Sequence, residues 1–201
     1  MDDLAVCYEN GIGCDKNPTL AFNLYLRSYL HGHALAAFHV ANCCFNGIGT
    51  DVDVETAIRF LRSGVEKQCP EAMHRLAWCQ YHGDGVEKND RKAVELLQKS
   101  AEQGNARAKY LLAYYYFNGD GGLGRSATQA AALWKEAAEQ GNNSAACKLA
   151  WCFENGYGYS QNYAKAAEWY RKAAEQGFAA AQFNLGLCYE YGDGVAKNLV
   201  E

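Results

Sequence analysis

The sequence predicts an all-α fold, a solenoid of helix-turn-helix repeats, and three observations support this. A G-x-G turn recurs every 36 or 37 residues, a period typical of repeat arrays. Apolar residues between the turns are spaced for helices, as in the stripe Ala145, Leu149 and Phe153. Proline occurs only twice, whereas the 20 glycines fall mainly at the turns. We therefore expect one solenoid domain over residues 1–201. The first glycines of its turns are Gly11, Gly47, Gly83, Gly119, Gly156 and Gly192.

In each repeat a first helix is expected to end one residue before the turn glycine. A small residue follows the apolar residue of its stripe, as in Leu149-Ala150 and Leu112-Ala113, so that a partner helix can approach closely. The two turn glycines permit a positive φ and end the helix. The turn at Gly119 carries one extra residue, which accounts for the single gap of 37.

A second helix is expected to begin after a capping residue that lies six positions past the turn glycine, or seven after the insertion. All the residues there are of types whose side chain accepts from free helical N–H groups. They are Asn17, Asp53, Asn89, Ser126, Asn162 and Asn198. Pro18 then occupies the first helical position, where a missing N–H costs nothing.

The second helices share a small residue and a common ending. The small residue is Ala21, Ala57, Ala93, Ala130 or Ala166. Three of these helices end in AEQG, whose glycine stops the helix. The second repeat departs from the pattern, with Gln68 at the stop and Gly64 inside the helix. We expect that helix to be less stable by about 1 kcal/mol than one with Ala at position 64.

Composition excludes several classes of protein. Apolar residues make up 49% of the 201 residues, enough for a continuous core. Lys and Arg number 19 against 23 Asp and Glu, and no basic stripe exists, so a nucleic-acid binder is not expected. No apolar run approaches the ~20 residues of a membrane helix, and no signal peptide is visible. Both ends interrupt a repeat, so we expect a fragment of a longer array.

Three stretches resemble one repeat family. They are LGLCYEYGDGVAKN at 185–198, KAAEWYRKAAEQG at 165–177 and GDGVEKNDRKA at 83–93. They are similar to the Sel-one-like repeat (SLR), a relative of the tetratricopeptide repeat, over essentially the whole chain. The resemblance implies a right-handed α/α superhelix, with first helices on the concave side and second helices on the convex side. It also implies a role as an adaptor or scaffold in multiprotein complexes. Members of the resembled family with such roles include bacterial host-directed proteins and components of ER-associated degradation.

The candidate binding residues lie on the first helices, off the core stripe, on the implied concave side. Trp78, Tyr114 and Trp151 occupy equivalent positions in three consecutive repeats, and such aromatics are typical protein-binding anchors. Asn at the last helical position both donates and accepts, which suits a peptide backbone. Arg75 and Lys148 add charge to the same surface. The candidate set is Asn42, Asn46, His74, Trp78, Tyr81, Tyr110, Tyr114, Asn118, Trp151 and Asn155.

Two plainer interpretations of these residues stay open. The aromatics can simply pack against the adjacent repeat, because most helical aromatic stripes belong to the core. The asparagines can cap carbonyl groups at the end of their own helix.

The nine cysteines predict neither disulfides nor a metal centre. Five share one repeat position, which places them about 10 Å apart in stacked helices, beyond the ~7 Å between Cα atoms that a disulfide needs. They are interpreted as small buried hydrophobes in a reducing compartment, such as the cytoplasm of its own or a host cell. Cys79 and His82 alone do not make a metal site. The sequence holds no C-x-x-C, phosphate-binding loop or S-x-x-K, so no cofactor, metal or catalytic residue is expected.

The sequence therefore predicts a non-enzymatic scaffold or adaptor that binds a partner protein or peptide in its concave groove. Trp78, Tyr114 and Trp151 would hold apolar side chains, and Asn46, Asn118 and Asn155 would hold the backbone. The alternative is a structural spacer, or a segment that self-associates through exposed terminal repeats. A hydrolase is the weakest hypothesis. Neither nucleic-acid binding nor membrane insertion is expected.

Overall fold

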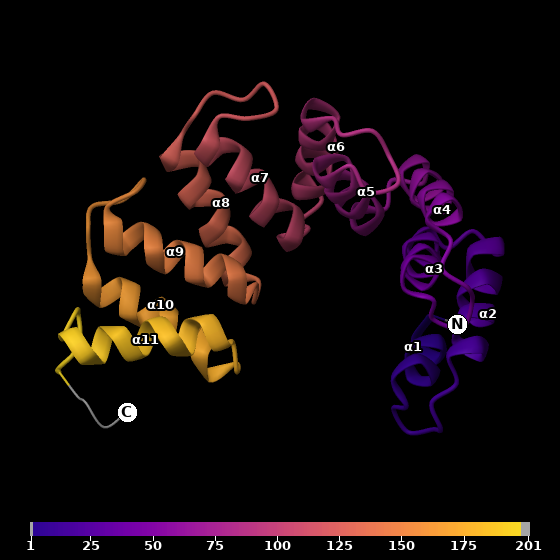
Figure 1. Ribbon diagram of the computed structural model, residues 1–201, viewed down its shortest axis with the longest axis horizontal. Helices are drawn as coiled ribbons and strands as arrows, with labels where there is room; N and C mark the ends of the chain where they lie inside the picture. Colours follow the sequence, from indigo (N-terminus) through magenta and orange to yellow (C-terminus); the bar gives the residue numbers. More distant parts are fainter. Residues whose placement is uncertain (1, 198–201) are drawn as a thin grey trace. The chain divides into compact units, whose positions relative to one another are not determined.

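The computed structural model describes residues 2–197, which form helices joined by turns, with no strand among them (Figure 1). The chain divides into two compact units, Met1–Gln103 and Gly104–Glu201, and each is described by itself. The first unit contains α1 (Asp2–Asn10), α2 (Pro18–Leu30), α3 (Ala34–Asn46), α4 (Val54–Glu66), α5 (Pro70–His82) and α6 (Asp90–Glu102). The second contains α7 (Ala106–Asn118), α8 (Ala127–Glu139), α9 (Asn143–Asn155), α10 (Tyr163–Glu175) and α11 (Ala179–Tyr191).

The predicted all-α repeat fold is confirmed. Odd-numbered helices are the first helices of repeats and even-numbered ones are the second helices. Within each unit, consecutive helices pack on each other, so α9 packs on α10 of its own repeat and on α8 of the repeat before it. Each first helix ends one residue before its turn glycine, as predicted. The single solenoid domain expected over 1–201 stays a prediction.

The helix caps follow the sequence closely. The side chains of Asn17, Asp53, Asn89, Ser126 and Asn162 each accept from the backbone N–H three residues on, at 2.9–3.2 Å. Asn198 lies outside the described residues. Asn105 and Asn142 cap α7 and α9 in the same way, which the turn pattern did not predict. These bonds satisfy backbone donors that a helix leaves free at its start.

Both glycines of each turn have a positive φ, and in several turns the second glycine also lies close to the repeat before it. The first adopts a left-handed conformation, with φ +73° at Gly156, and its N–H donates to the carbonyl of Cys152. The second, Gly158, lies against the start of the preceding second helix, where an added Cβ would come 2.5 Å from the carbonyl oxygen of Ala127. Gly49, Gly85 and Gly194 meet α2, α4 and α10 in the same way. The second glycine therefore lets the turn of one repeat rest on the repeat before it.

The core of the first unit lies between its first and second helices. Tyr25, Val40 and Leu61 are fully buried there, among the small residues Ala21, Ala41 and Ala57. The alanines predicted at the second helices are all buried, because they bring neighbouring helices close together. The core of the second unit is built alike around Trp134, Leu149 and Tyr170.

The departure in the second repeat has a packing reason. Gln68 does stop α4 with φ +58°, and it is the one residue other than glycine with a positive φ among residues 2–197. Gly64, however, is buried where α4 meets α3 and α5. A Cβ on Gly64 would lie 2.6 Å from the Cβ of Ala72 and 3.3 Å from that of Ala37. From the sequence, alanine is the more stable alternative at position 64. Alanine does not fit there unless the helices shift.

All nine cysteines are free, and four of the five at the shared position are buried. Cys43, Cys79, Cys152 and Cys188 are those four, and Cys7 is partly exposed. Burial raises the pKa of Cys79 to about 11 and that of Cys152 to about 12. These thiols are therefore protonated near neutral pH and pack as small apolar groups, as the sequence predicted.

Candidate functional site

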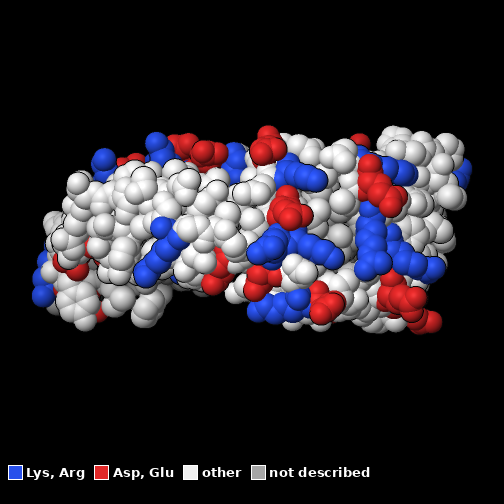
Figure 2. Space-filling model, turned by 90° about the horizontal axis from the view of Figure 1, so that it is seen from above, with Lys and Arg blue, Asp and Glu red and all other residues white. Residues whose placement is uncertain are grey.

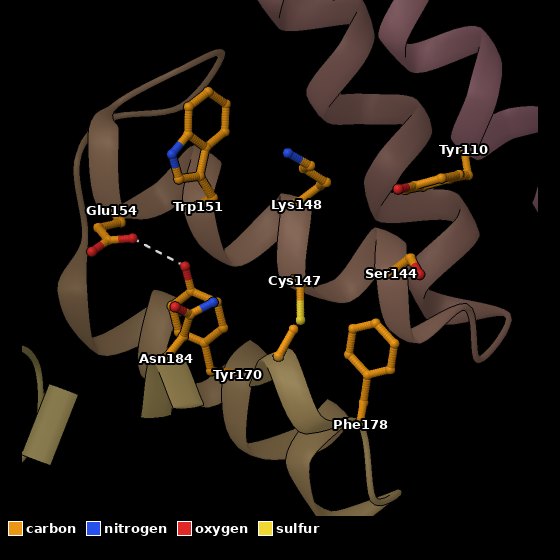
Figure 3. Close-up of a pocket in the computed structure, with 10 residues that line it drawn as sticks. Tyr110, Ser144, Cys147, Lys148, Trp151, Glu154, Tyr170, Phe178 and Asn184 are labelled. Atoms are coloured by element: carbon orange, nitrogen blue, oxygen red, sulfur yellow. Dashed lines mark hydrogen bonds between the residues drawn. The ribbon is translucent and has the colours of Figure 1, made fainter. Parts of the chain in front are cut away.

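The second unit has a pocket of about 350 Å³ on the face formed by its first helices. Figure 3 shows Ser144, Cys147, Lys148 and Trp151 along α9, with Tyr110 approaching from α7. The lining is completed by Tyr170 of α10, the residue Phe178 that caps α11, and Ala180 and Asn184 of α11. The lining therefore combines aromatic rings with one cation, one carboxylate and one amide.

Glu154 closes one side of this pocket through a hydrogen bond. The hydroxyl of buried Tyr170 donates to Oε2 of Glu154 over 3.0 Å, the dashed line of Figure 3. Burial, the charge of Glu154 and this hydrogen bond all raise the pKa of Tyr170. The first repeat builds the same pair, since the hydroxyl of Tyr25 donates to Glu9 over 2.6 Å. A tyrosine at this position of the second helix thus comes with a glutamate two residues before the turn glycine.

Lys148 provides the positive charge of the pocket. Its Nζ lies 5.2 Å from the ring centroid of Tyr114 and 5.4 Å from that of Trp151. Within residues 2–197 no carboxylate forms an ion pair with it. Lys109 of the same unit, by contrast, pairs with Glu136 at 2.7 Å. Lys148 is therefore held over aromatic rings, with its charge available to an anionic group that enters the pocket.

The pocket thiol does not favour nucleophilic chemistry. Burial raises the pKa of Cys147 to about 11, although the charge of Lys148 opposes the shift. The thiolate is the nucleophilic form, so this cysteine is largely unreactive at neutral pH. Among residues 2–197, no group of three or more His, Cys, Asp or Glu side chains could hold a metal ion. The lining residues supply aromatic surface and charged groups.

In the second unit the structure brings three predicted aromatics together. The hydroxyl groups of Tyr110 and Tyr114 are hydrogen-bonded at 3.1 Å, and the ring of Tyr114 packs edge-on against Trp134. Trp151 lies against Tyr157, with ring centroids 4.8 Å apart. Tyr110, Tyr114 and Trp151 are partly buried and contact the core of the unit. They pack on neighbouring residues, as the plainer interpretation expects, and they also keep exposed surface. Their role as binding anchors stays a prediction.

In the first unit Trp78 has similar surroundings. It is partly buried, and its ring centroid lies 4.2 Å from that of His82 and 4.6 Å from the guanidinium carbon of Arg75. Tyr81 is 40% exposed, and its ring faces Lys88 at 5.4 Å. His74 and Asn42, also in the candidate set, are partly buried on α5 and α3. Neither Trp78 nor Trp151 is sealed inside its unit.

For the predicted row of asparagines, the structure favours the plainer interpretation, in which each side chain caps the end of its own helix. The side-chain amides of Asn46 and Asn155 donate to the carbonyls of Asn42 and Trp151, four residues earlier, at 2.8 and 2.9 Å. Asn10 does the same toward Val6. Asn118 is exposed at the end of α7. The side-chain nitrogens of Asn10, Asn46 and Asn155 therefore cap their own helices. A hydrogen bond from these side chains to a partner would use their oxygen atoms.

Several pocket residues were not in the candidate set. Asn184 lies eight residues before its turn glycine, the position of Lys148 and Arg75, so the repeat register could have found it. Glu154 and Tyr170 repeat the pairing of Glu9 and Tyr25, which a comparison of the first and fifth repeats could also have shown. Ser144, Phe178 and Ala180 carry no such signal, because their place in the pocket depends on how neighbouring repeats pack.

On one face of the molecule, charges of both signs are interspersed, and Figure 2 shows Lys and Arg side chains beside Asp and Glu there. The pairs Lys135–Glu139 and Lys172–Glu168, one helical turn apart, are of this kind. No helix among residues 2–197 combines the length and apolar character needed to cross a membrane.

Solved structures with the same architecture belong to several bacterial proteins. A protective antigen of uropathogenic Escherichia coli with an SLR fold is 29% identical, with a TM-score of 0.81 over 98% of this chain and 42% of the antigen. A Sel1 repeat protein of Oxalobacter formigenes is 25% identical, with a TM-score of 0.88 over 100% of this chain and 81% of that one. An immunity protein of Pseudomonas aeruginosa is similar in fold, at 22% identity and a TM-score of 0.67 over 93% of this chain and 68% of that one.

This chain thus spans less than half the length of the antigen. A search of curated proteins gives no match. The model of the Sel1 repeat matches six consecutive segments, at residues 1–33, 34–68, 70–105, 106–142, 143–178 and 179–201. The first five segments each contain one helix pair described above, and the sixth contains α11. The chain therefore belongs to the Sel1 repeat family, whose members are generally protein–protein interaction scaffolds.

Proposed function

We propose that this chain is a non-enzymatic adaptor that binds a peptide segment of a partner protein on the faces formed by its first helices. The pocket of the second unit is the main anchor point. The observation that carries the proposal is that Tyr110 and Trp151, both predicted from the repeat register of the sequence, line this pocket. Its volume of about 350 Å³ falls in the range of small ligand sites and suits one or two peptide side chains.

The exposure of the aromatic residues supports the proposal. Trp and Tyr dominate binding energy at protein interfaces because they bring a large rigid surface and a polar tip. Trp78 and Trp151 stand at the same position of their repeats and are only partly buried. Tyr114 lies between them in the repeat register, but its ring packs against Trp134, which is buried in the core. We therefore assign the anchoring of apolar side chains mainly to the two tryptophans.

Selection of peptides followed by mutation tests the proposal. A displayed library of random twelve-residue peptides is selected on the immobilised chain, and the affinity of enriched peptides is measured by fluorescence anisotropy. We expect Trp151→Ala to weaken binding by about thirtyfold, as for a central interface residue. Trp169→Ala is the matched control, because Trp169 lies on α10 outside this pocket and interacts with Lys172.

The proposal fails if no peptide is enriched, or if Trp151→Ala and Trp169→Ala weaken peptide binding to the same extent. Circular dichroism and melting temperature of both variants must show that the helices persist. An unchanged affinity in Trp151→Ala, with the fold intact, would place binding elsewhere on the chain.

A second candidate function is self-association, and one observation favours it. Phe183 is 67% exposed and Tyr191 is 66% exposed, two turns apart on α11. Neighbouring exposed aromatics are typical of surfaces that another protein covers. Light scattering over a range of concentrations tests this candidate. A mass that rises with concentration in the wild type, but not in a Phe183→Ser, Tyr191→Ser variant, would support it. A constant monomer mass would contradict it.

A further inference from the structure

Two cations occupy the same position in different units. Arg75 and Lys148 each lie eight residues before a turn glycine and three residues before a tryptophan. The guanidinium carbon of Arg75 is 4.5 Å from the ring centroid of Phe45 and 4.6 Å from that of Trp78. Lys148 is placed in the same way over Tyr114 and Trp151. Each unit therefore carries a cation held between two aromatic rings on the face of its first helices.

Neither cation forms an ion pair in the part of the chain that the structure describes, whereas Lys109, Lys135 and Lys172 all have carboxylate partners. Aromatic faces attract a cation but do not cancel its charge. A carboxylate that reaches a partly buried cation forms a charge-assisted hydrogen bond, which is stronger than a bond between neutral groups. The position therefore favours an anionic group from outside.

The rest of the pocket limits what can accompany that anion. Tyr110, Trp151 and Phe178 offer aromatic surface, which suits a bulky apolar side chain. Glu154, whose Oε2 accepts from Tyr170, adds a negative charge to the lining. A run of acidic residues would bring further negative charge toward Glu154 and is disfavoured. The pocket therefore fits one carboxylate next to one apolar side chain.

We infer that the bound peptide carries an Asp or Glu directly beside a bulky apolar residue, with the carboxylate on Lys148 and the apolar side chain against Trp151. This inference rests on the proposed function and specifies the partner of the same site. Arg75 offers the same chemistry in the first unit.

The peptides enriched on the immobilised chain test the inference without a known partner. We expect them to contain an Asp or Glu next to Phe, Trp, Tyr, Leu, Ile or Met. Replacing that acidic residue by Asn or Gln in the synthetic peptide should weaken binding to the wild-type chain by about tenfold, the effect of one charged hydrogen bond. This arm changes only the peptide, so it does not depend on the stability of any variant.

A protein variant then identifies the cation. Lys148→Gln should weaken binding of the acidic peptide by about tenfold and should leave the affinity for the neutral peptide unchanged. Lys135→Gln is the matched control, because Lys135 lies on α8 and pairs with Glu139. Its affinity for the acidic peptide should equal that of the wild type. Raising the salt concentration should weaken binding of the acidic peptide more than binding of the neutral peptide.

The outcomes separate the two proposals. Enriched peptides that lack acidic residues, or an acidic peptide that binds Lys148→Gln as tightly as the wild type, would overturn the inference. The adaptor function would survive both results, provided that Trp151→Ala still weakens binding. If no peptide is enriched at all, the adaptor function fails first.

Discussion

Gln68 shows how one residue can depart from a repeat at a measurable cost. It ends α4 with φ +58°, where Gly32, Gly104, Gly141 and Gly177 end the other second helices. A side chain in the left-handed region costs about 1–2 kcal/mol, because Cβ approaches the following carbonyl oxygen. Glycine has no such cost but loses more backbone freedom on folding. At a helix end that requires a positive φ, the strain of the side chain exceeds the extra backbone entropy that glycine loses.

Gln68→Gly should therefore raise the free energy of unfolding by about 1 kcal/mol. Urea denaturation followed by circular dichroism measures the change. The matched variant is Gly32→Gln in the same unit, since Gly32 has φ +91° and a Cβ added there would point into open space. It should lose about as much stability as Gln68→Gly gains. Equal stability of Gln68→Gly and wild type would show that this turn tolerates a side chain without strain.

Individual residues also show what a sequence can and cannot predict. Capping residues such as Asn17 and Asn162 could be assigned because their acceptor and donor lie three residues apart in the chain. Tyr110 and Trp151 could be proposed from the repeat register alone. Phe178 and Ser144 could not, because they join the pocket only through the packing of neighbouring repeats. Contacts between residues a few positions apart follow from their spacing in the sequence. Contacts between repeats depend on how closely the helices pack, which the spacing does not give.

At the level of the helices, one buried position sets how closely neighbours approach. It holds Ser28, Gly64, Ser100, Ala137 and Ala173, all buried and all small. The hydroxyl of Ser100 donates to the carbonyl of Pro70 at 2.7 Å, so this position of α6 touches the start of α5. In α4 the neighbours are closer still, and only glycine fits without a shift. Helix propensity and packing therefore make opposite demands at Gly64.

Gly64→Ala decides which demand is larger. Propensity alone would stabilise α4 by about 1 kcal/mol. We expect a net loss of about 1–3 kcal/mol instead, because the new methyl group would lie 2.6 Å from Cβ of Ala72 and force the helices apart. Thermal unfolding of the purified variant measures the balance.

Two further variants control this experiment. Adding Ala72→Gly to Gly64→Ala removes the opposing methyl group and should recover part of the loss. Ser28→Ala at the equivalent position of α2 should be tolerated, because Ser28 already has a Cβ and its buried hydroxyl has no hydrogen-bond partner in the described part of the chain. A stabilised Gly64→Ala variant would mean that α4 can move away from α5 at little cost.

Across the whole molecule, the cores of both units contain protonated thiols. Burial raises the pKa of Cys43 and Cys152 to about 12, and that of Cys69, Cys79 and Cys147 to about 11, from an ordinary value of 9.0. The buried hydroxyls of Tyr25 and Tyr170 also have raised pKa values. Their protons are held more tightly in the folded chain than in the unfolded one. The stability of the molecule must therefore depend on pH in the alkaline range.

The direction of this dependence follows from the sign of the shifts. Below pH 9 the thiols are protonated in both states, so their contribution to stability is fully present. Between pH 9 and about 11–12 the unfolded chain loses thiol protons while the folded chain keeps them. The free energy of unfolding should then fall by up to about 1.4 kcal/mol per pH unit for each such thiol. Above pH 12 this contribution is lost.

Cys43→Ala should make this alkaline loss of stability shallower. Urea denaturation at pH 8, 9 and 10 gives the slope, and the variant should show a smaller decrease than the wild type even if it is less stable at pH 8. Ile58→Val, in the same core, is the control: it should lower stability by about 0.5–1.5 kcal/mol at every pH without changing the slope. Parallel curves for Cys43→Ala and wild type would show that this thiol ionises alike in both states, and that its burial does not hold the proton.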